Sequence, residues 1–268
     1  MTSETGFLET AGARIYYEVE GGGEPVVLIH AGVANLRMWD DQVAALRDRY
    51  RVIRYDTRGF GRTETDAVAF SNRADIAALL DHLGEESAHL VGFSRAGSIA
   101  LDFALESPER VRSLVVGAGG ISGYQSPEGL PDETFELPDR LEAAKDWEAL
   151  AEWEAAFWAD GPGQPTGRSG AVRDQVHDWV LENYRAEKTE GSPIVLDPPA
   201  ADRLSELKAP LLAILGTFDE PGTSAAMRHL AESVPGARLE VFDTAHMINL
   251  EQPDRFNRVL RDFLDANP

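Results

Sequence analysis

The sequence predicts an α/β protein with a doubly wound, mostly parallel sheet and an inserted helical cap. Apolar runs of strand length alternate with segments of helical spacing as far as Gly120, an order that builds a parallel sheet with right-handed crossovers. The alternation then stops, because residues 121–205 contain no convincing strand, and it resumes beyond them. We therefore expect a core domain formed by residues 1–120 and 206–268, interrupted by a cap at 121–205.

The first half of the chain supplies the antiparallel edge of the sheet and its first parallel strands. Residues 6–20 alternate apolar and polar side chains, which predicts one or two antiparallel strands. A strand at 25–30 is apolar on both faces, as in a buried parallel sheet, and further strands are predicted at 51–56, 88–93 and 111–116. Helices are predicted at 36–50, from the N-cap Ser71 to about Leu83, and directly after Ser94.

The second half combines the cap with the end of the sheet. Four of the five tryptophans fall in the cap, where they either pack its helices or line a pocket: Trp147, Trp153, Trp158 and Trp179. The last strands are predicted at 210–215 and 237–242, with a helix at about 224–233 between them and a final helix to about Leu264.

Composition restricts the possible classes of function. The 268 residues include no cysteine, which excludes disulfides, thiolate metal sites and a cysteine nucleophile. The net charge of −21 argues against nucleic acid and anionic membrane surfaces as partners. No signal peptide or membrane span is recognisable, so we expect a cytoplasmic protein that binds a small molecule and could form a homodimer.

The segment around Ser94 predicts a nucleophile. Gly92, Ala96 and Gly97 leave room for a nucleophile elbow, a sharp strand-to-helix turn in which the serine takes a strained backbone conformation. Such a turn presents the hydroxyl at the carboxyl edge of the sheet, in front of a helix N-terminus. The alternative is a buried serine in an ordinary connection, and the partners of Ser94 decide between the two.

Two further residues at strand ends are predicted to complete a catalytic triad. A serine needs a histidine to take its proton and a carboxylate to hold that histidine. Asp219 and His246 follow the last two strands, and the order Ser94, Asp219, His246 is the one expected for an open α/β sheet. Glu220 and Asp243 stay open as alternatives for the acid, because both lie close to these positions.

Backbone amides are predicted to form the oxyanion hole. Arg95 follows the nucleophile, and Gly32 lies in the loop after the strand that ends at His30, with Val33 as the second choice in that loop. His30 itself is expected to orient the loop, and no metal ion is expected at the site. Substrate contacts are predicted for Val33, Trp39, Trp147, Trp158 and Met247.

Together these motifs resemble the α/β-hydrolase superfamily over essentially the whole chain. The matching segments are 28–32 with Met38-Trp39, 55–61, the elbow, 215–219 and 245–247. The resemblance implies the α/β-hydrolase fold and a serine triad. The short cap is similar to those of esterases, enol-lactonases, cofactor-free haloperoxidase-like members and carbon–carbon bond hydrolases. One triad serves many reactions in this superfamily, so the substrate stays open.

We therefore expect a serine hydrolase of the carboxylesterase or lactonase type, without metal or organic cofactor. It would cleave a small carboxylic ester or lactone through an acyl-enzyme on Ser94. One alternative is hydrolysis of a carbon–carbon bond in a diketone-like compound, which a substrate screen would distinguish. The other is a small-molecule receptor on the same fold, which would bind a ligand without turnover.

Overall fold

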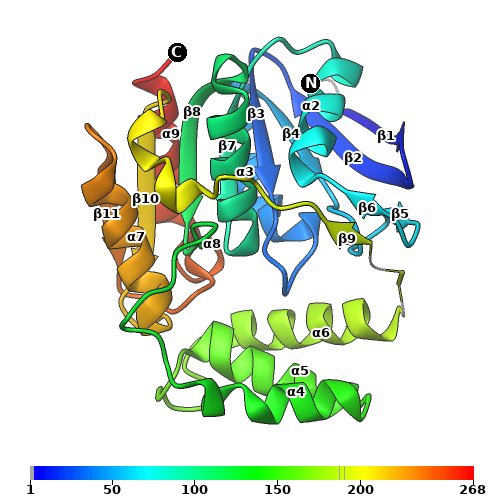
Figure 1. Cartoon of the computed structure of the whole chain (residues 1–268), viewed down its shortest axis with the longest axis vertical. Coiled ribbons are helices and arrows are strands. Elements are labelled where there is room, and N and C mark those ends of the chain that lie inside the picture. Colours follow the sequence, from blue (N-terminus) through cyan, green and yellow to red (C-terminus); the bar gives the residue numbers. More distant parts are fainter. Residues whose placement is uncertain (1–2, 187, 190) are drawn as a thin grey trace.

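A nine-stranded sheet forms the centre of the computed structural model, which describes residues 3–186, 188–189 and 191–268 (Figure 1). The strand order is β1-β2-β4-β3-β7-β8-β10-β11, with β5 paired to β2. β2 is antiparallel to β1, β4 and β5, whereas all neighbours from β4 to β11 are parallel. The strands of this sheet are β1 Ser3–Thr10, β2 Ala13–Gly21, β3 Glu24–Ile29, β4 Tyr50–Tyr55, β5 Glu64–Thr65, β7 Ala88–Phe93, β8 Val111–Gly117, β10 Leu211–Gly216 and β11 Arg238–Phe242.

Helices pack on both faces of the sheet, and each face has its own apolar cluster. On one face, Leu79 of α2, Ile99 of α3 and Met227 of α7 pack against strand side chains such as Val27. On the other face, α1 and α9 cover the neighbouring side chains of the same strands. Because side chains alternate between the faces of a strand, this arrangement needs strands that are apolar on both sides. The helices are α1 Asp40–Leu46, α2 Asn72–Leu83, α3 Arg95–Glu106, α7 Pro221–Ser233, α8 Ile248–Glu251 and α9 Pro253–Asp265.

The observed architecture confirms the predicted doubly wound, mostly parallel α/β sheet, and some element limits differ from expectation. Instead of one helix at 36–50, a 3₁₀ turn at Leu36–Trp39 leads into the short helix α1. α7 begins at Pro221, earlier than expected, because Glu220 caps it by accepting a hydrogen bond from the Thr223 amide. The expectation of no strand in 121–205 is wrong at one place, where β9 Ser192–Pro193 pairs with β6 Ala69–Phe70.

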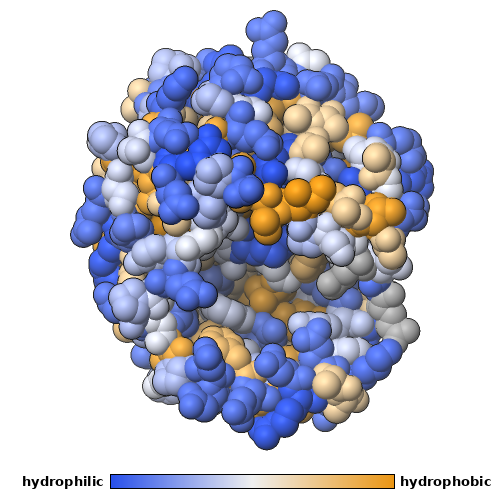
Figure 2. Space-filling model, viewed as in Figure 1, coloured by the Kyte–Doolittle hydropathy of each residue, from blue (hydrophilic) through white to orange (hydrophobic). Residues whose placement is uncertain are grey.

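Between β8 and β10 the chain forms a layer of helices beyond one end of the sheet (Figure 1). This layer contains α4 Glu136–Ala143, α5 Trp147–Glu154, a π-helical segment Ala155–Asp160 and α6 Ala171–Arg185. Figure 2 shows the same face of the molecule hollowed between this layer and the sheet, with apolar side chains inside the hollow. None of the helices in the described part of the chain is long and apolar enough to cross a membrane.

Candidate active site

Ser94 occupies a strained turn between β7 and α3. Its φ of 57° and ψ of −128° lie outside the regions that L-residues prefer. Its amide donates to the carbonyl of Gly117 at 2.8 Å, and its own carbonyl accepts from Gly97 at 2.8 Å, which holds the turn in place. A Cβ on Gly92 would lie 2.2 Å from the carbonyl oxygen of Ala96, so only glycine allows the helix to approach the strand this closely.

His246 and Asp219 form a buried pair beside this turn. Nδ1 of His246 lies 3.0 Å from both carboxylate oxygens of Asp219, and the two residues are only 3% and 6% exposed. A carboxylate accepts hydrogen bonds, so the proton of the neutral ring sits on Nδ1 and leaves Nε2 able to accept one. Phe93, the residue before Ser94, packs edge-on against the His246 ring at 6.0 Å. The elbow and the histidine therefore meet at the same edge of the sheet.

The two alternative candidates for the triad acid, Glu220 and Asp243, make contacts with other residues. Glu220 accepts from the amides of Thr223 at 2.6 Å and Leu130 at 2.9 Å, which ties the start of α7 to the loop after β8. Asp243 accepts from the Thr217 hydroxyl at 3.5 Å in an exposed position. Only Asp219 bonds to the His246 ring among the carboxylates that the structure describes.

His30 orients the loop that contains Gly32. Its Nδ1–H donates to the Ala31 carbonyl at 2.7 Å, and its Nε2 accepts from the Thr57 amide at 3.0 Å. Burial lowers the pKa of His30 to about 3, so the ring stays neutral and can use one nitrogen as donor and the other as acceptor. The ring thereby links the loop after β3 to the loop after β4.

The side chain of Arg95 runs along the same loop. A Cβ on Gly32 would lie 3.8 Å from its Nε, so Gly32 and Arg95 are neighbours. Nη2 donates to the Thr57 hydroxyl at 2.6 Å, and the guanidinium lies 4.8 Å from the centre of the Phe60 ring. The two predicted oxyanion residues are thus brought together, with a fixed positive charge beside them.

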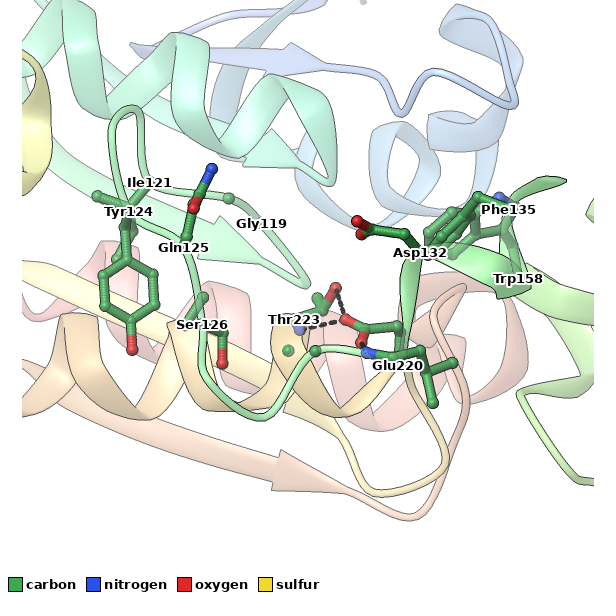
Figure 3. Close-up of a pocket in the computed structure, with 15 residues that line it drawn as sticks. Gly119, Ile121, Tyr124, Gln125, Ser126, Asp132, Phe135, Trp158, Glu220 and Thr223 are labelled. Carbon is green, nitrogen blue, oxygen red and sulfur yellow. Dashed lines mark hydrogen bonds between the residues drawn. The ribbon is translucent and has the colours of Figure 1, made fainter. Parts of the chain in front are cut away.

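Two cavities lie near these residues. An enclosed cavity of about 250 Å³ is lined by Gly32, Val33, Gly59, Phe60, Glu142, Glu154, Val180, Asn183 and Tyr184. A more open hollow of about 550 Å³ lies beside Glu220 and includes Trp158 in its wall. Figure 3 shows Phe135 and Trp158 on one side of the open hollow and Tyr124 and Gln125 on the other.

The five predicted substrate contacts are distributed unevenly over these cavities. Val33 lines the enclosed cavity, and Trp158 lines the open hollow. Trp147 is half-buried and stacks on Tyr184 at 5.2 Å, behind the cavity wall. Trp39 and Met247 are fully buried, and substrate contact is therefore corrected for both: each fills the core beneath the site, where Trp39 packs on Phe93 and Phe256.

Glu154 is a residue of this site that the sequence did not reveal. Its Oε2 accepts a hydrogen bond from Trp158 Nε1 at 2.6 Å, and the Trp158 ring lies 4.5 Å from the His246 ring. Burial raises the pKa of Glu154 to about 7, although the bond from Trp158 lowers it. The only sequence signal was its position four residues before Trp158 in a helical region, which brings the two side chains onto one helix face.

The described residues, 3–186, 188–189 and 191–268, contain no group of three His, Asp or Glu side chains arranged to hold a metal ion. The candidate site itself brings together three kinds of group. These are a strained serine, a histidine held by a buried carboxylate, and a loop of backbone amides.

Comparison with known proteins identifies the family. A model of the alpha/beta hydrolase family matches residues 26–259. The 2-hydroxy-6-oxo-6-phenylhexa-2,4-dienoate hydrolase of Comamonas testosteroni is 32% identical over 268 residues, covering 93% of this chain and 91% of that protein. The 3-oxoadipate enol-lactonase 2 of Acinetobacter baylyi is 30% identical over 237 residues, covering 84% and 83%. A solved bromoperoxidase structure from Bacillus anthracis has a TM-score of 0.79 at 27% identity, covering 98% of this chain and 100% of that one. The chain therefore belongs to the alpha/beta hydrolase family.

Proposed function

We propose that the protein is a serine hydrolase that cleaves a small carboxylic ester or lactone through an acyl-enzyme on Ser94. The main support is the contact of His246 Nδ1 with both oxygens of Asp219 at 3.0 Å, beside a serine held at a φ of 57°. This contact supplies the oriented base that an ordinary serine hydroxyl needs in order to react. A relative that is an enol-lactonase adds support for an ester or lactone bond.

In the proposed reaction, Nε2 of His246 takes the proton of the Ser94 hydroxyl as Oγ attacks the acyl carbon. The backbone amides of Arg95 and Gly32 stabilise the oxyanion that forms. His246 then gives its proton to the departing alkoxide, and the acyl group stays on Ser94. A water molecule, activated by the same histidine, releases the acid. Asp219 keeps the proton on Nδ1 and stabilises the charged imidazolium in both halves of the reaction.

We also propose that the helices of residues 121–205 act as a cap that shapes the substrate pocket. Glu142, Glu154, Val180, Asn183 and Tyr184 come from this segment, and they face Gly32 and Phe60 of the core across the enclosed cavity. A cavity closed in this way would exclude bulk water and limit the size of the acyl group.

The test of this function is labelling with a fluorophosphonate probe together with hydrolysis of p-nitrophenyl acetate. Labelling and turnover are expected in the wild-type protein and lost in Ser94→Ala. Ser98→Ala is a matched control, because Ser98 lies one turn further along α3 and donates its hydroxyl to the Arg95 carbonyl at 2.8 Å. If the folded wild-type protein were neither labelled nor active, the nucleophile assignment would be wrong and a receptor function would be favoured.

Hydrolysis of a carbon–carbon bond is a second candidate, favoured by the 32% identity to the dienoate hydrolase of Comamonas testosteroni. The same serine and histidine would serve it. The loss of absorbance of 2-hydroxy-6-oxo-6-phenylhexa-2,4-dienoate, compared with hydrolysis of a phenyl ester of similar size, distinguishes the two reactions. Faster turnover of the ester supports the first proposal, and faster turnover of the dienoate supports the second.

A further inference from the structure

The enclosed cavity beside Gly32 has carboxyl groups in a wall that is otherwise apolar, aromatic or uncharged. Glu154 comes from the end of α5 and Glu142 from α4, while Phe60 and Tyr184 contribute aromatic rings. Glu142 is exposed and Glu154 is half-buried, so only Glu154 loses part of the water around its charged form, and this loss costs free energy unless a partner replaces the water. A carboxyl group in this position therefore needs an explanation.

Glu154 is fixed in place on one side only. Trp158 donates to Oε2 at 2.6 Å, and no residue that the structure describes donates a hydrogen bond to Oε1. The carboxyl therefore keeps one oxygen for a molecule inside the cavity. Only Trp158 separates it from the proposed base, because the Trp158 ring also lies tilted against the His246 ring, with the ring centres 4.5 Å apart.

The cavity has a negatively charged end at Glu154 and a positively charged end at Arg95. Glu142 adds a second negative charge, and with burial it favours the protonated form of Glu154, whereas the hydrogen bond from Trp158 and the charge of His246 favour the ionised form. Tyr184 contributes a phenol from α6. Arg95 places its positive charge over Phe60 and against Gly32, at the end where the oxyanion would form.

We propose that Glu154 is a specificity-determining residue that binds a cationic nitrogen of the substrate, while the scissile carbonyl lies at Gly32. The inference rests on the serine hydrolase function proposed above. A substrate ammonium would replace the water that the carboxylate loses in the cavity, and the Arg95 guanidinium over Phe60 would repel it from the Gly32 end. A second carboxylate on the substrate would instead be repelled by Glu154 and Glu142.

The experiment compares three p-nitrophenyl esters that differ in charge. The acyl groups are 4-(trimethylammonio)butyrate, its neutral isostere 5,5-dimethylhexanoate, and glutarate with one free carboxylate. We expect the wild-type protein to prefer the cationic ester to its isostere by about tenfold in kcat/KM at pH 8. The preference should fall as the pH drops through about 7, where Glu154 becomes protonated.

Variants assign the preference to Glu154. Glu154→Gln keeps an acceptor for Trp158 but removes the charge, so the ratio should drop to about one and lose its pH dependence. Glu142→Gln should keep a preference and shift its midpoint to lower pH, because a neighbouring negative charge is removed. Glu136→Gln is the matched control, since Glu136 is exposed on the same helix α4 and should leave the ratio unchanged.

Equal kcat/KM values for the cationic ester and its isostere in the wild-type protein would overturn the inference. Ser94-dependent turnover of the neutral ester would then still support the hydrolase function. Binding of the matching amides, measured by calorimetry, gives a readout that does not require turnover. Tighter binding of the cationic amide to the wild-type protein than to Glu154→Gln supports the cation site even if no ester is cleaved, and equal affinities contradict it.

Discussion

Asp219 contacts His246 through both carboxylate oxygens, and this single contact decides which ring nitrogen carries the proton. The backbone amide of Glu220 donates a hydrogen bond to Oδ1 of Asp219 at 2.7 Å. This bond keeps the carboxylate from rotating away from His246. The charge of Asp219 is therefore both oriented and buried. In the proposed reaction, a neutral group of the same shape at this position would no longer stabilise the imidazolium and would favour the wrong tautomer.

Replacement of Asp219 by asparagine should lower kcat for p-nitrophenyl acetate by about 10³- to 10⁴-fold while leaving the fold intact. Glu220→Gln is the control, because glutamine keeps the shape of the side chain and one of the two oxygens that the Thr223 and Leu130 amides use separately, and Glu220 makes no bond to His246, so most of the activity should remain. Steady-state kinetics with circular dichroism of each variant provides the measurement. A large loss in Glu220→Gln with little loss in Asp219→Asn would reverse the assignment of the acid.

His30 should remain neutral far below the pH at which a free histidine titrates. Its pKa is about 3 in the folded protein against 6.5 for the ordinary side chain, because burial disfavours the charged form. The unfolded chain therefore takes up this proton first. The stability contributed by neutral His30 is fully present above pH 6.5 and falls by about 1.4 kcal/mol per pH unit as the pH drops toward 3.

Nuclear magnetic resonance of the imidazole nitrogens tests this behaviour directly. Between about pH 8 and 5, the His30 signals should keep the pattern of a neutral ring protonated at Nδ1. The same protein unfolded in urea serves as the reference, since its histidines titrate in the ordinary range. A His30 signal that titrates near 6.5 in the folded protein would contradict the burial and hydrogen bonding described for it.

For single residues, the sequence was most informative at the ends of strands. The location of Ser94, Asp219 and His246 at one edge of the sheet could be predicted because parallel strands bring their carboxyl ends to one edge, whatever the details of the loops. Glu154 could not, because no such rule relates a helix of the inserted segment to the sheet. Trp39 was wrongly predicted to contact substrate, because closeness to the oxyanion loop in sequence does not reveal that the ring points into the core.

At the scale of elements, the approach of α3 to β7 and β8 positions Ser94, the proposed nucleophile. The helix packs so closely that a Cβ on Gly92 would meet the Ala96 carbonyl at 2.2 Å, and a Cβ on Gly97 would meet Gly119 at 2.9 Å. These two glycines therefore set the distance between helix and sheet. The turn of Ser94 is strained because the elements on either side of it are fixed so near to each other.

Gly92→Ala should lower the melting temperature and the activity together. The clash with the Ala96 carbonyl must be relieved by moving α3, which we expect to cost about 1–3 kcal/mol and to lower Tm by several degrees. Gly22→Ala is the matched control, since a Cβ there would meet nothing within 4 Å and should leave Tm unchanged or slightly higher. An unchanged Tm and full activity in Gly92→Ala would show that the helix is not held at this distance.

Helices and strands whose ends are marked by residues nearby in the sequence were predicted well. Those that form only through pairing or packing with distant segments were not. The helix α2 was delimited correctly because Ser71 accepts from the Ala74 amide at its start and Gly84 takes a φ of 75° at its end. β9 was missed because it has two residues, one of them a proline, and exists only through pairing with β6. The π-helical segment at Ala155–Asp160 also lacks a local signal, although it carries Trp158 to His246.

At the scale of the whole molecule, 46 acidic residues outnumber 25 basic ones and produce a net charge of −21. A charge of this size creates a field that extends beyond the surface at low ionic strength, and it attracts cations toward the protein and repels anions. The same sign is present locally at Glu142 and Glu154 in the enclosed cavity. The net charge of the molecule and the two cavity carboxylates therefore both favour a cationic substrate. Their contributions can be separated by varying the salt concentration.

Raising the ionic strength from about 10 mM to about 300 mM should change kcat/KM in opposite directions for the cationic and the anionic ester. The reason is that salt shortens the reach of surface charge from about 30 Å to less than 10 Å. We expect a several-fold decrease for the trimethylammonio ester, an increase for the glutarate ester, and little change for the neutral isostere. Partly buried charges are screened less, so the preference caused by Glu154 should persist at high salt in the wild-type protein and be absent in Glu154→Gln. The slope of kcat/KM against salt should be the same in both proteins, since one charge in 21 hardly alters the long-range field. If the slope vanished with Glu154 alone, the salt dependence would come from the cavity rather than from the whole molecule.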